Sequence, residues 1–418
     1  MSRHYYLTRA GRLRRKDNTL LFEPKPEAQQ AKGLEMGAAA LGWEAASEES
    51  SGLTDDLETP DTATAADVFV PDADVMGDLL LESPILTDDE AAEQSGINAE
   101  DDEREATLPA VRVAERRVIP IQDVEALWVF GELDLNARVL NLLAQHKKPA
   151  HFFNYYGFYT GSFYPREHLQ AGFVLVRQVR HYSNKRLRQE IARQFVEASL
   201  YNIIRNLRYY GTRGAAVDAQ TEAVQIEILN LPATKRIDEL MGCEGRARAA
   251  YYSAFGQILR SPEFELTKRV RRPPDNMINA LLSYANGLVY TAVLSQIYRT
   301  QLDPTVSFLH EPGFRRFSLA LDLAEVFKPI LADRLIFKML NTRQLSERDF
   351  AQDLNCCYLK ESGRKKVLAE WDGRLKTTIE HRRLKRPVSY ERLIRLECYK
   401  LVKHLTGDEP YKGFKAWW

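Results

Sequence analysis

Residues 185–211, which read KRLRQEIARQFVEASLYNIIRNLRYYG, repeat their apolar side chains with the period of an α-helix. The same period continues from about residue 168 to the C-terminus and predicts further amphipathic helices, for example in IDELMGCEGRARAAYYSAFGQILR, INALLSYANGLVYTAVLSQIYRT and YERLIRLECYKLVKHLTG. Earlier in the chain, HYYLT, GRLRRKDN, TLLFE, RVIPI and ALWVFG are short strand-like runs, and the turn-forming Asp17-Asn18 ends the second of them, before TLLFE. The sequence therefore predicts an α+β fold, with a small β-rich N-terminal domain (residues 1–165) and a large all-helical domain (166–418).

The net charge of zero conceals a strong segregation of charge. Residues 34–103 contain 21 acidic side chains and no lysine or arginine. The other 348 residues carry 58 basic and 37 acidic side chains, a balance of +21. A basic body of this size is typical of proteins that bind nucleic acid, although a solvated basic surface is the plain alternative. The acidic composition, poor in aromatic residues, predicts a disordered insertion at about 26–112 within the N-terminal domain.

The remaining composition indicates a cytoplasmic protein. The four cysteines show no paired spacing, which favours free thiols in a reducing compartment. The N-terminus lacks the apolar stretch of a signal peptide, and we find no uninterrupted apolar run long enough to cross a membrane. No phosphate-binding glycine loop and no GxSxG motif is present.

Glu244 is the first candidate for chemistry. On a helix beginning at Ile237 it shares a stripe with Leu240, Ala247 and Tyr251. A carboxylate on an apolar helix face is costly unless a cation compensates it. That partner is either an arginine or a metal ion, and the residues alone favour arginine.

The stretch SFLHEPGFRRFSLALDLAEVFKP (307–329) supplies the second candidate. His310 precedes a Glu-Pro-Gly turn, and a helix follows from about Ser318. On that helix Asp322 and Glu325 form an acidic stripe on an otherwise apolar surface, which indicates a buried helix whose acidic side lines a cleft. Carboxylates with one imidazole suit Mg²⁺ or Mn²⁺ better than zinc. The alternative is that Asp322 and Glu325 pair with arginines such as Arg315, Arg316 or Arg334.

Basic residues near these segments are candidates for phosphate contacts. Arg271 and Arg272 precede two prolines, whose rigid backbone would hold them as a clamp. Arg315 and Arg316 lie beside the candidate site. Each pair could equally be part of a solvated loop.

Several landmarks together resemble one known family. LMGCEGRARAAYY, RRPPDNMINALLSYANGLVY, LDPTVSFLHEPGFRRFSLALDLAEVFKPILADRLIF and the ending YKGFKAWW occur in the order and spacing of the CRISPR-associated spacer-acquisition endonuclease and integrase ("Cas one") family, in its type I-B branch. Ala285 stands where this family usually has glycine. The acidic stretch is not part of the family core.

The resemblance implies a β-rich dimerisation domain and a helical catalytic domain. It implies that Glu244, His310 and Glu325 bind Mg²⁺ or Mn²⁺, and that Asp322 belongs to the catalytic site. It implies an antiviral CRISPR adaptation enzyme that cleaves DNA and inserts spacer DNA into a CRISPR array through 3′-hydroxyl attack at a repeat boundary. The implied partners are protospacer and repeat DNA, a second copy of the chain and the small companion protein "Cas two".

Two alternatives remain open at this point. The protein could be a catalytically idle DNA-binding scaffold of the same acquisition complex. It could also be a general nuclease for branched repair intermediates. The presence of all three implied ligands favours an active enzyme.

Overall fold

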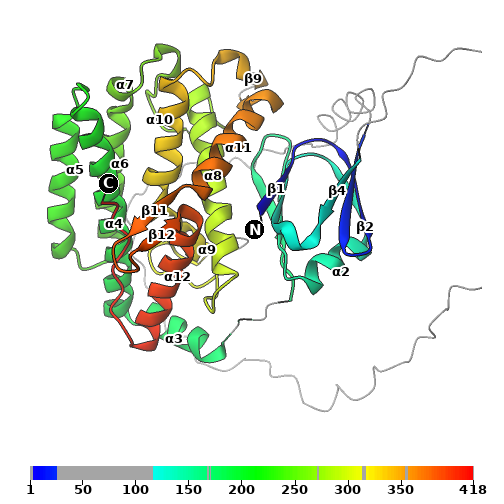
Figure 1. Cartoon of the computed structure of the whole chain (residues 1–418). Helices are drawn as coiled ribbons and strands as arrows, with labels where there is room; N and C mark the ends of the chain where they lie inside the picture. The colour runs from blue at the N-terminus through cyan, green and yellow to red at the C-terminus, as the bar shows by residue number, and fades with distance from the viewer. Residues whose placement is uncertain are drawn as a thin grey trace, which may run out of the picture. The chain divides into compact units, whose positions relative to one another are not determined.

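The computed structural model describes residues 3–25, 116–166, 169, 171–270, 273–312, 317–353 and 356–417. These residues belong to one compact unit. Figure 1 shows strands in the N-terminal part of the chain and mainly helices in the remainder. The insertion predicted at 26–112 lies wholly outside the described residues.

In the described N-terminal part, two four-stranded sheets have the orders β1-β5-β7-β8 and β4-β3-β2-β6. The pairs β1/β5, β5/β7 and β2/β6 are parallel, whereas β7/β8, β2/β3 and β3/β4 are antiparallel. The strand bounds are β1 Arg3–Leu7, β2 Gly11–Lys16, β3 Thr19–Pro24, β4 Arg117–Pro120, β5 Val124–Val129, β6 Leu133–Leu135, β7 Ala150–Phe153 and β8 Tyr159–Phe163.

The β2–β3 hairpin follows directly from its sequence. Asp17 adopts a left-handed backbone conformation, with φ of 52°, which a two-residue hairpin turn requires. Leu13 lies opposite Phe22, and both are buried. The turn predicted at Asp17-Asn18 is therefore confirmed.

A helix covers the small core of this part. Helix α2 (Ala137–Gln145) begins after Asn136, whose side chain accepts a hydrogen bond from the Val139 amide. Val139, Leu142 and Leu143 are buried in a cluster with strand residues. These contacts give the β-rich part an apolar core.

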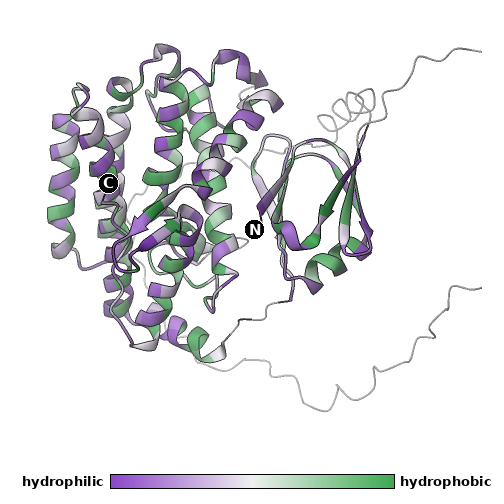
Figure 2. Cartoon of the chain, viewed as in Figure 1, coloured by the Kyte–Doolittle hydropathy of each residue, from purple (hydrophilic) through white to green (hydrophobic). Residues whose placement is uncertain are grey.

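The second part of the chain is built mainly from helices. Their bounds are α3 Gly172–Ser183, α4 Lys185–Gly211, α5 Asp218–Asn230, α6 Ile237–Ser253, α7 Phe255–Ile258, α8 Met277–Ile297, α9 Ser318–Lys328, α10 Arg334–Asn341, α11 Glu361–Lys376 and α12 Tyr390–Thr406. Figure 2 shows hydrophobic and hydrophilic residues on the same helices, as expected for elements with a buried and an exposed side.

The predicted fold class is confirmed, with one refinement. Two short antiparallel hairpins interrupt the helices: β9 (Phe350–Asp353) with β10 (Cys356–Leu359), and β11 (Thr378–His381) with β12 (Arg386–Ser389). The predicted domain boundary at 165 falls between β8 and α3, and the division of the chain at that residue stays a prediction.

Helix α8 lies in the centre of the helical part. It starts after Asn276, whose side chain accepts a hydrogen bond from the Asn279 amide at 2.9 Å. Sixteen of its residues are buried, on all sides of the helix, so the amphipathic pattern predicted for this segment is wrong. By length and composition α8 could cross a membrane, but 72% of its most apolar window is buried within the protein, as in a core helix.

The helix that carries the acidic stripe is continuous but irregular. α9 passes through a π-helical turn, η5 (Pro329–Asp333), into α10. Proline has no amide hydrogen to donate, which is a common reason for such an interruption. Two buried asparagines of α4 bond to carbonyls of this stretch: Asn202 donates to the Val326 carbonyl at 3.0 Å, and Asn206 to the Pro329 carbonyl at 2.8 Å.

Candidate functional site

Helix α6 supplies Glu244 and, one turn later, Arg248. Leu240, Ala247 and Tyr251 of this helix are buried, whereas Met241 is exposed. Arg248 is itself buried, at 8% exposure. Glu244 is 21% exposed in its side chain, so it stands at the edge of the buried helix face rather than within it.

Asp322 organises the loop that precedes its own helix. One of its oxygens accepts hydrogen bonds from the backbone amides of Phe308 (2.6 Å) and Leu309 (2.9 Å). The other accepts from the amide of His310 at 2.9 Å and contacts the Nδ1 atom of the His310 ring at 2.8 Å. Asp322 is completely buried, so these bonds replace its hydration.

This arrangement determines which nitrogen of His310 is available. A carboxylate can only accept, so Nδ1 is the protonated nitrogen of the neutral ring and Nε2 keeps its lone pair. The side chain is 23% exposed. A histidine fixed by a carboxylate in this way is typical of metal ligands.

Glu325 lies one turn beyond Asp322 and is held by two cations. Its Oε1 contacts the Lys328 ammonium at 2.5 Å, and its Oε2 contacts Nη2 of Arg248 at 2.5 Å. Burial raises the pKa of this carboxyl, but the positive charges of Lys328 and Arg248 outweigh it and lower the pKa to about 2.

Arg248 also contacts Glu244, through its Nε atom. One guanidinium therefore joins a carboxylate from α6 to a carboxylate from α9. The same Nη2 lies 3.4 Å from the Ser199 hydroxyl of α4. The arginine partner that the sequence favoured for Glu244 is thus Arg248.

The structure brings the predicted site residues together in two linked groups. Glu244 and Glu325 share Arg248, and His310 is paired with Asp322 three residues before Glu325. Within the described residues, no three or more His, Cys, Asp or Glu side chains already surround a common point at metal-binding distance. Arg334, a suggested partner of the acidic stripe, instead donates to Asn206 at 2.7 Å. Arg271, Arg272, Arg315 and Arg316 lie outside the described residues.

The donor set nevertheless fits a hard divalent cation. Two ionisable carboxylates already hold a positive group between them, and His310, held by Asp322, has an available ring nitrogen. Oxygen donors with a single imidazole are the ligands that Mg²⁺ and Mn²⁺ accept.

Sequence reasoning missed four residues that build the site. Arg248 and Lys328 neutralise the acidic side chains, and Asn202 and Asn206 hold the backbone of α9 and η5. The spacing of residues in the sequence could have indicated each of these two pairs. Arg248 and Lys328 lie one helical turn from Glu244 and Glu325, and the two asparagines occur one turn apart on the apolar face of α4.

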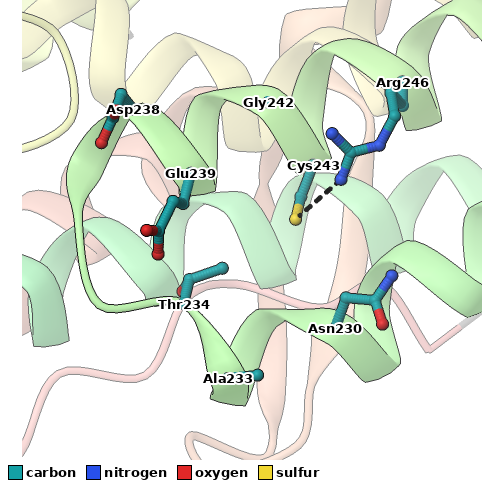
Figure 3. Close-up of a pocket in the computed structure, with 8 residues that line it drawn as sticks. All are labelled: Asn230, Ala233, Thr234, Asp238, Glu239, Gly242, Cys243 and Arg246. Carbon is teal, nitrogen blue, oxygen red and sulfur yellow. Dashed lines mark hydrogen bonds between the residues drawn. The ribbon is translucent and has the colours of Figure 1, made fainter.

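A shallow pocket on the outer side of α6 does not coincide with this site. It is lined by residues of α5, α6 and the turn between them, including Asn230, Thr234, Cys243 and Arg246 (Figure 3). Arg246 reaches the Cys243 sulfur at 3.4 Å and pairs with Glu227. Glu244, His310 and Glu325 are not among its lining residues.

Comparison with known proteins finds relatives that this chain matches over most of their length. The family model described as "CRISPR associated protein Cas1" matches residues 102–373. A CRISPR-associated endonuclease Cas1 of Thermodesulfovibrio yellowstonii is 53% identical over 304 residues, which cover 73% of this chain and 92% of the relative. One from Fusobacterium nucleatum is 49% identical over 304 residues, covering 73% of this chain and 90% of the relative.

A solved structure gives the same result at the level of the fold. The structure of a CAS1 protein from Thermotoga maritima matches with a TM-score of 0.69 and 32% sequence identity, covering 99% of this chain and 100% of that one. The chain therefore belongs to the CRISPR-associated Cas1 family.

Proposed function

We propose that this protein is a CRISPR adaptation integrase, a metal-dependent DNA endonuclease that inserts new spacer DNA into a CRISPR array. The observation that carries the proposal is that Arg248 joins Glu244 to Glu325, while Asp322, three residues before Glu325, contacts His310. Family membership and the names of the two relatives, both endonucleases, support it.

In this proposal Glu244, His310 and Glu325 hold Mg²⁺ or Mn²⁺. When bound, the ion supplies a positive charge that polarises the scissile phosphate. His310 contributes its Nε2 atom, and Asp322 keeps the ring in the required tautomer and orientation. Lys328 holds Glu325 ionised. The burial of Asp322 and Glu325 excludes water, which strengthens these electrostatic interactions.

The chemical step is a phosphoryl transfer. The 3′-hydroxyl oxygen of the incoming fragment attacks phosphorus at the repeat boundary and forms a new phosphodiester. The bond from phosphorus to the 3′-oxygen of the repeat strand breaks, and that oxygen leaves and takes up a proton. Hydrolysis follows the same course with water as the nucleophile. Catalysis of such a step consists mainly of positioning and charge neutralisation.

The partners follow from the same proposal. The body with a balance of +21 outside residues 34–103 binds the phosphates of protospacer and repeat DNA. Arg271, Arg272, Arg315 and Arg316 are the proposed phosphate contacts. The protein acts in the cytoplasm as a homodimer, together with the small companion protein "Cas two".

The test is a strand-transfer and nuclease assay with Mg²⁺ or Mn²⁺, comparing the wild type with Glu244→Ala. Loss of a ligand should lower the rate about 10³-fold or more, with DNA binding retained. If the wild type binds DNA but neither cuts nor joins it, the protein is a scaffold. If it cleaves four-way junctions in preference to CRISPR-repeat DNA, it is a repair nuclease.

A further inference from the structure

Arg248 occupies the position between Glu244 and Glu325 where a bound cation would be expected. Its guanidinium contacts both carboxylates, through Nε to Glu244 and through Nη2 to Glu325. We infer that Arg248 is a built-in competitor of the metal, which neutralises the two glutamates in the metal-free protein and releases them when the ion enters. This inference rests on the proposed function, since it assumes that the same glutamates bind the ion.

The first reason is electrostatic. Two carboxylates brought together in a buried site repel each other and lose hydration unless a cation lies between them. Arg248, at 8% exposure, supplies that charge with a planar group that reaches both partners at once. Lys328 cannot replace it, because its single ammonium contacts only Glu325 among these two residues.

The second reason is that the arginine and the ion exclude each other. A divalent cation bound by Glu244 and Glu325 would lie next to the guanidinium, and two such positive charges at contact distance repel. Arg248 must therefore turn away from at least one carboxylate before that oxygen can ligate the ion. Metal affinity then equals the intrinsic affinity of the ligands reduced by the free energy of breaking these contacts.

A third observation identifies an acceptor for the displaced guanidinium. Asp333, in the π-helical turn η5, is 2% exposed, and its Oδ2 atom has no hydrogen-bond partner within the described part of the chain. Burial raises the pKa of this carboxyl to about 6, and the nearby charge of Arg248 partly opposes the shift. Asp333 thus offers a buried oxygen that has no partner among the described residues, and we assign it the role of positioning residue for the released side chain.

The experiment measures Mn²⁺ binding by the full chain, using the electron paramagnetic resonance signal of the free ion. The proteins are the wild type, Arg248→Met, Arg248→Lys and Asp333→Asn. Arg246→Met is the matched control, because it removes a guanidinium from the same helix that pairs with Glu227 instead. Glu244→Gln reports whether the proposed ligands bind the ion at all.

Arg248→Met should bind Mn²⁺ roughly tenfold more tightly than the wild type, because the positive guanidinium that repels the ion is removed. Arg248→Lys should be intermediate, because an ammonium cannot bridge both carboxylates with two parallel hydrogen bonds. Asp333→Asn should bind more weakly than the wild type, and Arg246→Met should equal it. Thermal unfolding in chelator should show Arg248→Met to be less stable than the wild type, with a larger stabilisation by Mn²⁺.

Unchanged or weaker Mn²⁺ binding by Arg248→Met would overturn the inference, as would tightening by the Arg246→Met control. If Arg248→Met does not fold, unchanged or weaker Mn²⁺ binding by Arg248→Lys would overturn the inference instead. If Glu244→Gln binds Mn²⁺ as well as the wild type, the proposed metal site itself fails, and the inference falls with it. If Glu244→Gln loses the ion while both Arg248 variants bind as the wild type does, only the inference fails.

Discussion

Asp322 holds His310 at two points. The backbone amide of His310 donates to the carboxylate at 2.9 Å, and Nδ1 of the His310 ring contacts the same oxygen at 2.8 Å. The two residues lie 12 positions apart in the chain, and the same carboxylate accepts hydrogen bonds from the amides of Phe308 and Leu309, immediately before His310. The orientation of the ring is thus determined by a residue of the neighbouring helix, independently of any ion.

Asp322→Asn should therefore impair the site without removing a metal ligand. The amide keeps one acceptor oxygen but places an NH₂ group against backbone donors, so His310 loses its fixed tautomer. We expect metal affinity or strand transfer to fall about 10- to 100-fold. The measurement is Mn²⁺ binding alongside strand transfer. Wild-type values for both in a folded Asp322→Asn protein would show that the pair has no such role.

Asn202 connects the site to the C-terminal tail. Its amide donates to the carbonyls of Val326 and Phe414, and its oxygen accepts from the Ala416 amide at 2.8 Å. Asn202→Ala removes these three buried hydrogen bonds, and should lower the free energy of unfolding by about 3 kcal/mol. Urea denaturation measures this, with Asn141→Ala on the exposed side of α2 as the control. Equal losses in the two variants would contradict the assigned role.

Asp333 makes stability depend on pH. Burial raises its pKa from 3.8 to about 6, so the folded state binds this proton more tightly than the unfolded state. The contribution of this carboxyl to stability is thus greatest below pH 4 and falls as the pH rises through 6. Relative to Asp333→Asn, the wild type should lose up to about 3 kcal/mol over this range.

Denaturant unfolding at several pH values in chelator tests this dependence. Asp134→Asn, which removes an exposed carboxylate, reports the general effect of deleting one negative charge. A difference between the wild type and Asp333→Asn that does not change with pH would show that Asp333 does not titrate differently in the folded protein.

The acidic stretch 34–103 should compete with DNA for the basic body. Its 21 acidic side chains match the +21 balance of the remaining residues. Deletion of residues 34–103 should tighten non-specific DNA binding at low salt, with the difference disappearing as salt screens the charges. Fluorescence anisotropy with a random-sequence duplex measures this. A segment of equal length with its acidic residues replaced by Asn and Gln should behave like the deletion. Binding that is unchanged at every salt concentration would leave the stretch as a linker.

The sequence predicts those features of the fold that depend on local periodicity and turn chemistry. The hairpin at Asp17-Asn18 and the start of α8 at Asn276 follow from the preferences of those residues. The amphipathic prediction for α8 was wrong because its neighbours cover every side, which periodicity within one segment cannot reveal. Arg248 lies one turn from Glu244 and was within reach of sequence reasoning. Its contact with Glu325 joins residues 77 positions apart and depends on how α6 and α9 pack.

The most direct test of the central claim is a crystal structure of the full chain with Mn²⁺, using the anomalous scattering of the ion to locate it. We expect one strong peak within ligand distance of Glu244, Glu325 and Nε2 of His310, with Arg248 turned away from at least one of the two glutamates. A peak at another site, or an Arg248 that still bridges both carboxylates at saturating Mn²⁺, would contradict it.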